Sequence, residues 1–250
     1  MMNSPFQLNG KKILVTGASS GIGRSVAVFL SEMGAELILT ARREQQLKES
    51  ISLLKGGIHS YVVADLLKEE DRNQLINSLS AVDGVVFSAG KIEPFPVKFL
   101  SKEKLDSVMD LNFSSTVLLA ASLLRSKKIN DHASMVFISS FGAHHTYKGG
   151  AAYAASKLGV EAFAQVIAQE HGASGIRCNC VAPAMVKTEV YEETERQISA
   201  EKLNDHIQKY PLGVGYPEDV AHAISFLLSP ASRWITGQTL FLDGGLSLGL

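Results

Sequence analysis

Seven short apolar runs, separated by longer segments, constrain the fold of this chain more than any other feature. Several of them are continuously apolar rather than alternating, as in Ile-Leu-Val, Val-Val-Phe and Met-Val-Phe-Ile. Short continuous runs are typical of strands buried on both faces, as in a parallel sheet. The runs span residues 13–16, 36–41, 60–65, 84–88, 135–139, 176–182 and 239–242.

The segments between these runs carry the helical spacing of apolar residues. In residues 21–33, for example, Ile22, Val26 and Phe29 recur at intervals of three and four. Alternating strands and helices predict an α/β fold, a doubly wound parallel sheet of about seven strands with helices on both faces. Because no linker, repeat or low-complexity tract interrupts the pattern, we interpret residues 1–250 as a single domain.

Composition places the chain among globular proteins. Hydrophobic residues make up 46% and charged residues 20% of its 250 residues, and the formal net charge is −1. These values exclude a disordered chain, a collagen and a coiled coil. The near-zero charge favours neither nucleic acid nor a membrane surface as a partner. No uninterrupted apolar stretch reaches the roughly 18 residues of a membrane span.

Two cysteines bear on location and metal binding. Cys178 and Cys180 are two positions apart in a strand-like run, so their thiols should point to one face. Too few other ligands lie nearby for a metal site, and we expect buried, unpaired thiols that fit a reducing compartment. Residues 1–10 also lack the pattern of a signal peptide. These features together predict a cytoplasmic protein.

Residues 187–210 differ from the rest of the chain. They are polar and rich in charge, they follow a strand-like run, and they end before Pro211. We interpret this stretch as a helical excursion over the carboxyl edge of the sheet, forming a lid over a site. A solvated surface helix is the alternative.

The first apolar run leads directly into Thr-Gly-Ala-Ser-Ser-Gly-Ile-Gly at 16–23, and a helical pattern follows. Glycines allow a tight turn and a close approach of backbone to a pyrophosphate, whose charge the helix N-terminus stabilises. The spacing is Gly-x3-Gly-x-Gly, not the better-known Gly-x-Gly-x-x-Gly. We interpret the turn as a dinucleotide site, with a ligand-free structural turn as the alternative.

The ends of the second and third runs bear on the cofactor. An NAD site usually has an acidic residue after the second strand, whereas residues 39–43 read Leu-Thr-Ala-Arg-Arg. Arg42 could pair with a 2′-phosphate, which favours NADP over NAD, or it could be a solvated surface residue. Asp65 could accept a hydrogen bond from adenine, with Leu66 beside the ring, or it could cap the next helix.

A tyrosine and a lysine share one face of a predicted helix. Tyr153 and Lys157 are four positions apart within residues 151–169. An ordinary tyrosine, with a pKa of about 10, is a poor acid–base catalyst at neutral pH. A nearby ammonium and a positive nicotinamide ring would lower that pKa. Taken alone, the pair is equally explained as two helix-surface residues.

Other polar residues favour a site around this pair. Ser139 ends the fifth run and Ser140 follows it, at the sheet edge where open α/β sheets bind ligands. A serine hydroxyl there could hold a substrate carbonyl toward the tyrosine. Asn112 lies in an apolar helical stretch, 105–124, and needs a partner such as a water or a backbone carbonyl. A purely structural asparagine is the alternative.

Together these motifs resemble the short-chain dehydrogenase/reductase family. The resemblance covers about residues 8–246 and implies a Rossmann-like fold and an oxidoreductase that uses a nicotinamide cofactor. It is carried by the turn at 16–23, Asn112, Ser140, Tyr153 thirteen positions later, Lys157, Val-Ala-Pro at 181–183 and the Thr-Gly-Gln…Asp-Gly-Gly segment from 236 to 245.

The resemblance implies a role for each matching residue. Tyr153 would be the general acid in reduction and the base in oxidation, and Lys157 would bind the nicotinamide ribose and lower the tyrosine pKa. Ser140 would position the carbonyl, and Asn112 would hold a water in the proton relay. The cofactor site would comprise Gly17, Ser19, Ser20, Gly21, Ile22, Gly23, Arg42, Asp65, Leu66, Ser88, Ala89, Gly90, Tyr153, Lys157, Pro183, Val186 and Thr188.

Three positions depart from the family pattern. Ser88 stands where the family usually has asparagine, and Ala184 replaces a glycine after Pro183. Ser20 occupies a position that is often basic in members that use NADP. The preference for NADP therefore depends on Arg42 and on the missing acid.

The substrate is less constrained. The segment 210–221 and the C-terminal tail look most like 3-oxoacyl-carrier-protein reductases, which implies an acyl-carrier-protein thioester as substrate, although the often basic position before Gly175 is Ser174. A sugar, polyol or other small-molecule dehydrogenase is the alternative, as is a non-catalytic dinucleotide-binding sensor. His144, His145 and Tyr147 are expected to line the substrate mouth, the histidines without a catalytic role.

The resemblance also implies an assembly. The family's usual homotetramer would place the helices around 101–125 and 150–171 at one interface and the C-terminal strand region at another.

Overall fold

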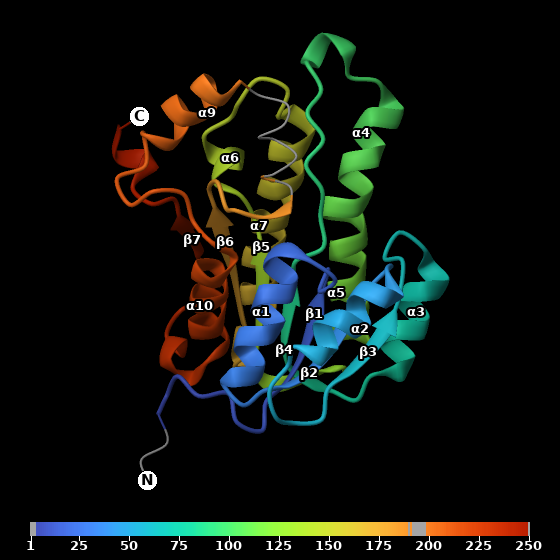
Figure 1. Ribbon diagram of the computed structural model, residues 1–250. Helices are drawn as coiled ribbons and strands as arrows, with labels where there is room; N and C mark the ends of the chain where they lie inside the picture. The colour runs from blue at the N-terminus through green and yellow to red at the C-terminus, as the bar shows by residue number, and fades with distance from the viewer. Residues whose placement is uncertain (1–3, 190, 192–198, 250) are drawn as a thin grey trace.

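The computed structural model of the protein describes residues 4–189, 191 and 199–249. The strands in these residues form one parallel sheet in the order β3-β2-β1-β4-β5-β6-β7 (Figure 1). The predicted parallel sheet of about seven strands is therefore confirmed. The strands are Lys12–Thr16 (β1), Glu36–Ala41 (β2), Ser60–Val63 (β3), Val82–Phe87 (β4), Ile129–Ile138 (β5), Arg177–Pro183 (β6) and Thr239–Leu242 (β7).

Helices cover both faces of the sheet, because successive residues of the continuous apolar strands point to opposite sides. Apolar side chains from α1, α2 and α10 pack on one face with Ile13 and Val15 of β1, and those from α3, α5 and α7 pack on the other face with Leu14. The helices are Gly21–Glu32 (α1), Glu44–Ser52 (α2), Glu69–Ser78 (α3), Lys102–Met109 (α4), Ser115–Arg125 (α5), Phe141–His144 (α6), Ala151–His171 (α7), Ala200–Ile207 (α9) and Pro217–Leu228 (α10).

Helices α1 and α10 come from opposite ends of the chain and lie side by side (Figure 1). Val26 and Leu30 of α1 share one buried apolar cluster with Ile224 and Leu227 of α10. The N-terminal and C-terminal parts of the sequence therefore complete the same core.

The direction in which successive strands are added to the sheet reverses between β1 and β4. The chain runs outward from β1 to β2 and β3, and then returns to β4 on the other side of β1. Open α/β sheets bind ligands beyond the carboxyl ends of the strands at such a point. The segments that follow β1 and β4 begin at Gly17 and Ser88, so the glycine turn lies at this crevice.

The last part of the stretch 187–210 contains a helix, and its role as a lid stays a prediction. Helix α9 stands beyond the carboxyl ends of the strands (Figure 1), and Tyr210, just after it, is buried in a cluster with Phe141 of α6. The rest of the lid prediction, residues 190 and 192–198, lies outside the described residues.

Within the described residues, the helical run Lys102–Arg125 is long and apolar enough to cross a membrane, judged by length and composition alone. Polar residues interrupt this run, so it is not an uninterrupted apolar stretch in the sequence. Leu119, Ala120 and Leu123 of this run are buried in the apolar cluster between the sheet and helices α3, α5 and α7. The run is therefore a partly buried core helix.

Candidate active site

The glycine turn is packed too tightly for side chains at two positions. Gly17 has φ +65°, and a Cβ atom added there would lie 2.8 Å from the backbone nitrogen of Ala89. A Cβ atom on Gly23 would lie 2.4 Å from the carbonyl oxygen of Gly17. The Thr16 hydroxyl accepts hydrogen bonds from the amides of Ser88 and Ala89, at 3.0 and 3.2 Å. The turn and the end of β4 thus form one rigid unit.

The N-terminus of α1 suits a dinucleotide pyrophosphate. Ser20 is the N-cap residue, but its side chain makes no capping hydrogen bond, and the first turn of the helix has no acidic residue. The first amide N–H groups of a helix have no intrahelical partner and attract anions. Among the described residues, the Glu189 carboxylate comes nearest, with Oε2 3.3 Å from a Cβ position on Gly21. Because neither Ser20 nor the first turn of α1 supplies a capping oxygen or an acid, the residues of the turn fit the bound cofactor that the sequence predicts.

Arg43, rather than Arg42, contacts the glycine turn. The Arg43 guanidinium donates hydrogen bonds to the hydroxyls of Ser19 and Ser20, at 3.0 and 2.8 Å. Arg42 is exposed, and the structure gives it no hydrogen bond or ion pair among the residues it describes. Sequence reasoning missed this arrangement, because the order Arg-Arg after a strand does not reveal which side chain folds back onto the turn.

Tyr153 and Lys157 are both buried on the same face of α7, and the two residues are only 7% and 6% exposed. The Lys157 ammonium lies 5.9 Å from the centre of the Tyr153 ring and donates a hydrogen bond to the carbonyl of Ile138, at 2.8 Å. Burial lowers the pKa of Lys157 to about 8. The alternative of two surface residues is therefore wrong.

Burial also sets the protonation of the tyrosine. It raises the pKa of Tyr153 to about 12, and a hydrogen bond with the Ser140 side chain lowers that pKa in part. In the protein alone, Tyr153 is therefore a neutral phenol at neutral pH, next to a lysine that is still mostly protonated.

The two predicted serines point to different places. Ser140 follows β5 and is the N-cap residue of α6, where its Oγ accepts a hydrogen bond from the amide of Gly142 at 3.1 Å. Its side chain also interacts with Tyr153. Ser139 is buried and points away, donating a hydrogen bond to the carboxylate of Glu161. The structure therefore brings Ser140, but not Ser139, to the tyrosine.

Asn112 is fully buried in a single wide turn, Asp110–Ser114, between α4 and α5. Its side chain accepts from the amide of Lys91 at 2.8 Å and donates to the carbonyl of the same residue at 2.9 Å. A Cβ atom on Gly90 would lie 3.2 Å from Asn112 Oδ1 and 3.4 Å from Lys157 Nζ. Asn112 therefore has a backbone carbonyl as its partner, and Gly90 lies next to both Asn112 and Lys157.

The loop after β6 approaches the glycine turn. A Cβ atom on Gly21 would lie 3.6 Å from Thr188 Cγ2. Thr188 Oγ1 donates to the carbonyl of Val186, at 3.5 Å, and Val186 pairs with Gly215 in an isolated bridge. The loop that begins at Pro183 thus closes the site opposite the turn.

Asp65 and Leu66, which follow β3, make only local hydrogen bonds among the described residues. Leu66 is buried, and the Asp65 carboxylate accepts a hydrogen bond from the amide of Leu67 at 3.2 Å. The N-cap residue of α3 is Lys68, so the alternative in which Asp65 caps that helix is wrong. Its predicted contact with adenine stays a prediction.

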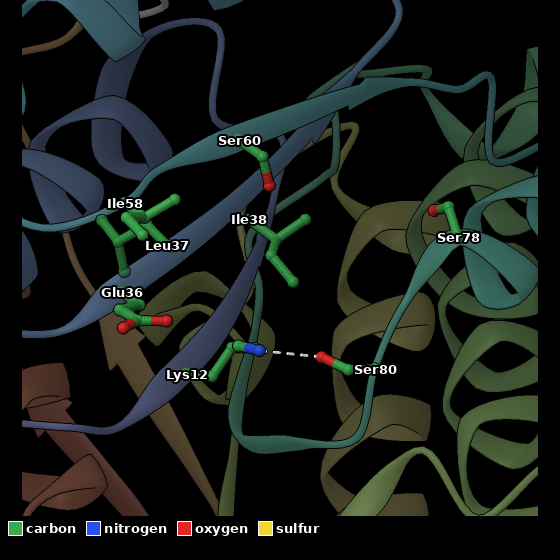
Figure 2. A pocket seen from close by; sticks show the side chains of 8 residues that line it. All are labelled: Lys12, Glu36, Leu37, Ile38, Ile58, Ser60, Ser78 and Ser80. Atoms are coloured by element: carbon green, nitrogen blue, oxygen red, sulfur yellow. Dashed lines mark hydrogen bonds between the residues drawn. The ribbon is translucent and has the colours of Figure 1, made fainter.

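A separate hollow of about 200 Å³ lies at the other end of the sheet. Figure 2 shows it beside Lys12 and Glu36, the first residues of β1 and β2, with Lys12 donating to Ser80 at 2.9 Å. None of the predicted site residues lines it. The candidate active site is the group of side chains at the carboxyl ends of the strands.

Comparisons with known proteins agree with this geometry. Residues 17–247 match the family model described as enoyl-(acyl carrier protein) reductase. The chain is 32% identical over 243 residues to a 3-oxoacyl-(acyl-carrier-protein) reductase of Rickettsia felis, covering 96% of this chain and 98% of that protein. It is 34% identical over 265 residues to a glucose 1-dehydrogenase of Gluconobacter oxydans, covering 99% and 96%.

Among solved structures, a short-chain type dehydrogenase/reductase from Mycobacterium ulcerans superposes with a TM-score of 0.87. It is 30% identical, and the match covers 97% of this chain and 91% of that one. Family match, sequence similarity and shared fold extend over nearly the whole length. The chain belongs to the short-chain dehydrogenase/reductase family and is an oxidoreductase of that family.

Proposed function

We propose that this enzyme reduces a carbonyl to a secondary alcohol, or runs the reverse reaction, with NADP(H) as its cofactor. The observation that carries the proposal is the convergence of Tyr153, Ser140 and Lys157 at the carboxyl ends of the strands. The turn at 16–23 lies at the same edge of the sheet. A bound nicotinamide cofactor supplies the hydride chemistry there.

The side chains have distinct roles in this mechanism. Tyr153 holds the proton on its phenol oxygen, because burial raises its pKa to about 12, and it delivers that proton to the developing alkoxide in reduction. Ser140 donates a hydrogen bond to the carbonyl oxygen and keeps it beside the phenol. In oxidation, Tyr153 accepts the proton as a phenolate, and the positive charge of Lys157 stabilises that phenolate.

Lys157 and Asn112 support the proton transfer. Lys157 binds the nicotinamide ribose. It also passes the proton between Tyr153 and a water that Asn112 holds beside Gly90. The 3.2 and 3.4 Å approaches of Asn112 Oδ1 and Lys157 Nζ to a Cβ position on Gly90 support this connection. Any side chain at position 90 would separate the two groups.

The proposed preference for NADP is supported by Arg43 and by the missing acid after β2. The Arg43 guanidinium lies against Ser19 and Ser20, at the start of α1, and no acidic residue ends β2 to bind a ribose 2′-hydroxyl. A guanidinium forms strong charge-assisted hydrogen bonds with a phosphate. This arrangement supports NADP rather than NAD. Gly17, Gly21, Gly23 and the loop from Pro183 to Thr188 complete the proposed cofactor site.

For the substrate we propose a 3-oxoacyl thioester carried by an acyl carrier protein. The support is the similarity to the reductase of Rickettsia felis, which is named for that substrate. A sugar substrate is the second candidate, because the glucose 1-dehydrogenase of Gluconobacter oxydans is equally similar. We further propose a cytoplasmic location, which the free, buried thiols of Cys178 and Cys180 support.

The experiment compares NADPH with NADH oxidation on short 3-oxoacyl thioesters, simple ketones and ketoses. Turnover of a thioester with NADPH is the expected result. Turnover of a sugar or ketone alone would keep the mechanism and reject the acyl substrate. NADPH binding without turnover of any compound would favour the dinucleotide-binding sensor.

Replacement of Tyr153 by phenylalanine separates the enzyme from the sensor. The variant keeps the ring but loses the proton donor, so kcat should fall by about 1000-fold, while the Kd for NADPH, followed by fluorescence titration, stays within about threefold. Tyr61→Phe removes a hydroxyl that donates to the Glu44 carboxylate at 3.3 Å, outside the proposed site, and is the control. Unchanged turnover in Tyr153→Phe would reject the proposed acid.

A further inference from the structure

A buried carboxylate lies beside the site and has no part in the proposed chemistry. Glu161 is on α7, one turn beyond Lys157 and two turns beyond Tyr153, so the three side chains share one face of the helix. Only 7% of Glu161 is exposed. Carboxylates are almost never so buried unless they are paired, so the partners of Glu161 indicate what it does.

Three separate elements donate to this carboxylate. The Ser139 hydroxyl, just after β5, donates to Oε1. The Thr239 hydroxyl, which begins β7, donates to Oε2 at 3.1 Å. His144 Nε2, at the end of α6, lies 3.0 and 2.9 Å from the two oxygens. An ionised carboxylate only accepts hydrogen bonds, so the tautomer of His144 that fits this contact is the one with its hydrogen on Nε2.

These contacts flank the serine of the candidate site. Ser139 immediately precedes Ser140, and His144 ends the four-residue helix that Ser140 caps. So short a helix has too few internal hydrogen bonds to stabilise itself. Glu161 therefore fixes both sides of Ser140, while the His144 ring also packs edge-on against Phe241, with ring centres 4.9 Å apart.

We propose that Glu161 is a positioning residue that holds Ser140 in place for carbonyl binding, acting through Ser139 and His144. This inference rests on the proposed function, because it assigns Ser140 to the carbonyl. It also explains the place of His144, whose ring fastens the end of α6 and does not take part in proton transfer.

A double-mutant cycle with Ser140 tests the proposal. Glu161→Gln preserves shape but turns an N–H donor toward groups that are themselves donors. We expect kcat for carbonyl reduction to fall about tenfold, with the KM for NADPH within about twofold. In a Ser140→Ala background, the same change should alter kcat by less than about twofold. Glu170→Gln, an exposed glutamate on the same helix, is the matched control and should leave kcat unchanged.

Variants of His144 test the second contact. His144→Ala should reproduce the loss seen in Glu161→Gln. His144→Gln, whose amide N–H takes the place of Nε2–H, should recover at least half of the lost kcat. Equal losses from Glu161→Gln in both serine backgrounds would overturn the proposal, because they would show a general structural role. Unchanged kcat in Glu161→Gln would overturn it as well.

Hydrogen–deuterium exchange keeps this test separate from the proposed function. If the wild-type enzyme turns over none of the carbonyl compounds, the proposed function fails, and the positioning contact is then judged by exchange alone. Glu161→Gln should accelerate exchange in residues 139–145 relative to Glu170→Gln, and leave β1 and α1 unchanged. Equal exchange of residues 139–145 in the two variants would overturn the contact itself.

Discussion

Tyr153 and Lys157 show how burial alone can prepare two residues for opposite roles. Removal from water disfavours the charged form of each group, so it raises the pKa of Tyr153 to about 12 and lowers that of Lys157 to about 8. The tyrosine is thereby held as an acid, and the lysine comes close to losing its charge. A deprotonated lysine would no longer assist the phenolate, so this site works best where Lys157 remains charged.

The pKa of Lys157 predicts how stability changes with pH. In the unfolded chain this lysine stays protonated to about pH 10.5, but in the folded protein it loses its proton near pH 8. Between these values the unfolded state binds more protons, so raising the pH stabilises the folded state. The cost of burying the charge is therefore complete below pH 8 and disappears toward pH 10.5.

Lys157→Met, which cannot titrate, reveals this dependence. Between pH 7.5 and 9.5, the free energy of unfolding of the wild-type protein should rise relative to the variant by on the order of 2 kcal/mol. Urea unfolding without added nucleotide measures the difference. A difference that stays constant with pH would show that Lys157 keeps an ordinary pKa.

The two neighbouring arginines make a matched pair for cofactor choice. Arg43→Ala should weaken NADPH binding by about tenfold or more, because a charge-assisted hydrogen bond contributes about 1.5–3 kcal/mol, and should leave NADH binding nearly unchanged. Arg42→Ala should have the smaller effect, since its side chain does not contact the turn. Fluorescence titration of both cofactors measures this. A larger loss in Arg42→Ala would support the interpretation made from the sequence.

The strands and the main helices could be predicted because both depend on apolar spacing. β2 and β7 have the predicted bounds, but β5 begins at Ile129, six residues earlier than expected. Its first half contains Asn130, Asp131 and His132, and His132 adopts φ +62°. A polar, locally irregular strand start has no apolar pattern, so only the pairing with β4 reveals it.

The candidate site was predictable where a motif fixes a local geometry. Tyr153 and Lys157 share a face because of their helical spacing, and Ser140 lies at a strand end. Side-chain contacts between residues far apart in the sequence could not be predicted. Arg43 folds back onto the turn, and Glu161 forms hydrogen bonds with three elements that are distant in sequence. The one signal for Glu161 was a charged residue on the face of α7 that carries Tyr153 and Lys157.

The glycine turn allows steric crowding to be separated from backbone strain. Gly17 and Gly56 have similar φ values, +65° and +60°, but a Cβ atom at Gly17 would clash with Ala89, whereas one at Gly56 would meet no atom within 4 Å. Gly56→Ala should cost about 1–2 kcal/mol from strain alone. Gly17→Ala should cost clearly more and should also abolish NADPH binding.

Urea unfolding of the two variants gives the comparison, and fluorescence titration gives the binding. Equal losses of stability would show that the turn can shift away from the end of β4. In that case the tight packing of the turn would not be needed to form the cofactor site.

The whole molecule leaves apolar side chains on two surfaces that the predicted tetramer would cover. Leu118 of α5 and Leu158 and Val166 of α7 are 41–49% exposed on one of them. On the other, Trp234 is 91% exposed beside the edge strand β7, together with Leu240 and Phe241. Exposed apolar patches of this kind mark interaction surfaces, which supports the proposed homotetramer.

Light scattering tests the assembly. The wild-type protein should have a mass about four times the 26.9 kDa of one chain. Leu158→Glu places a charge on α7 and should yield a smaller species, whereas Leu53→Glu, a change at a leucine of similar exposure that lies away from α5, α7 and β7, should not. A wild-type mass equal to one chain would contradict the proposed tetramer.

The packing of α1 against α10 has a consequence for synthesis. The apolar face of α1 leaves the ribosome early, but the helix that covers it is among the last to emerge. During most of translation, Val26 and Leu30 therefore lack their final partners. The native core can form only after nearly the whole chain has been released. A nascent chain that stops before α10 therefore exposes the apolar face of α1 to chaperones and proteases.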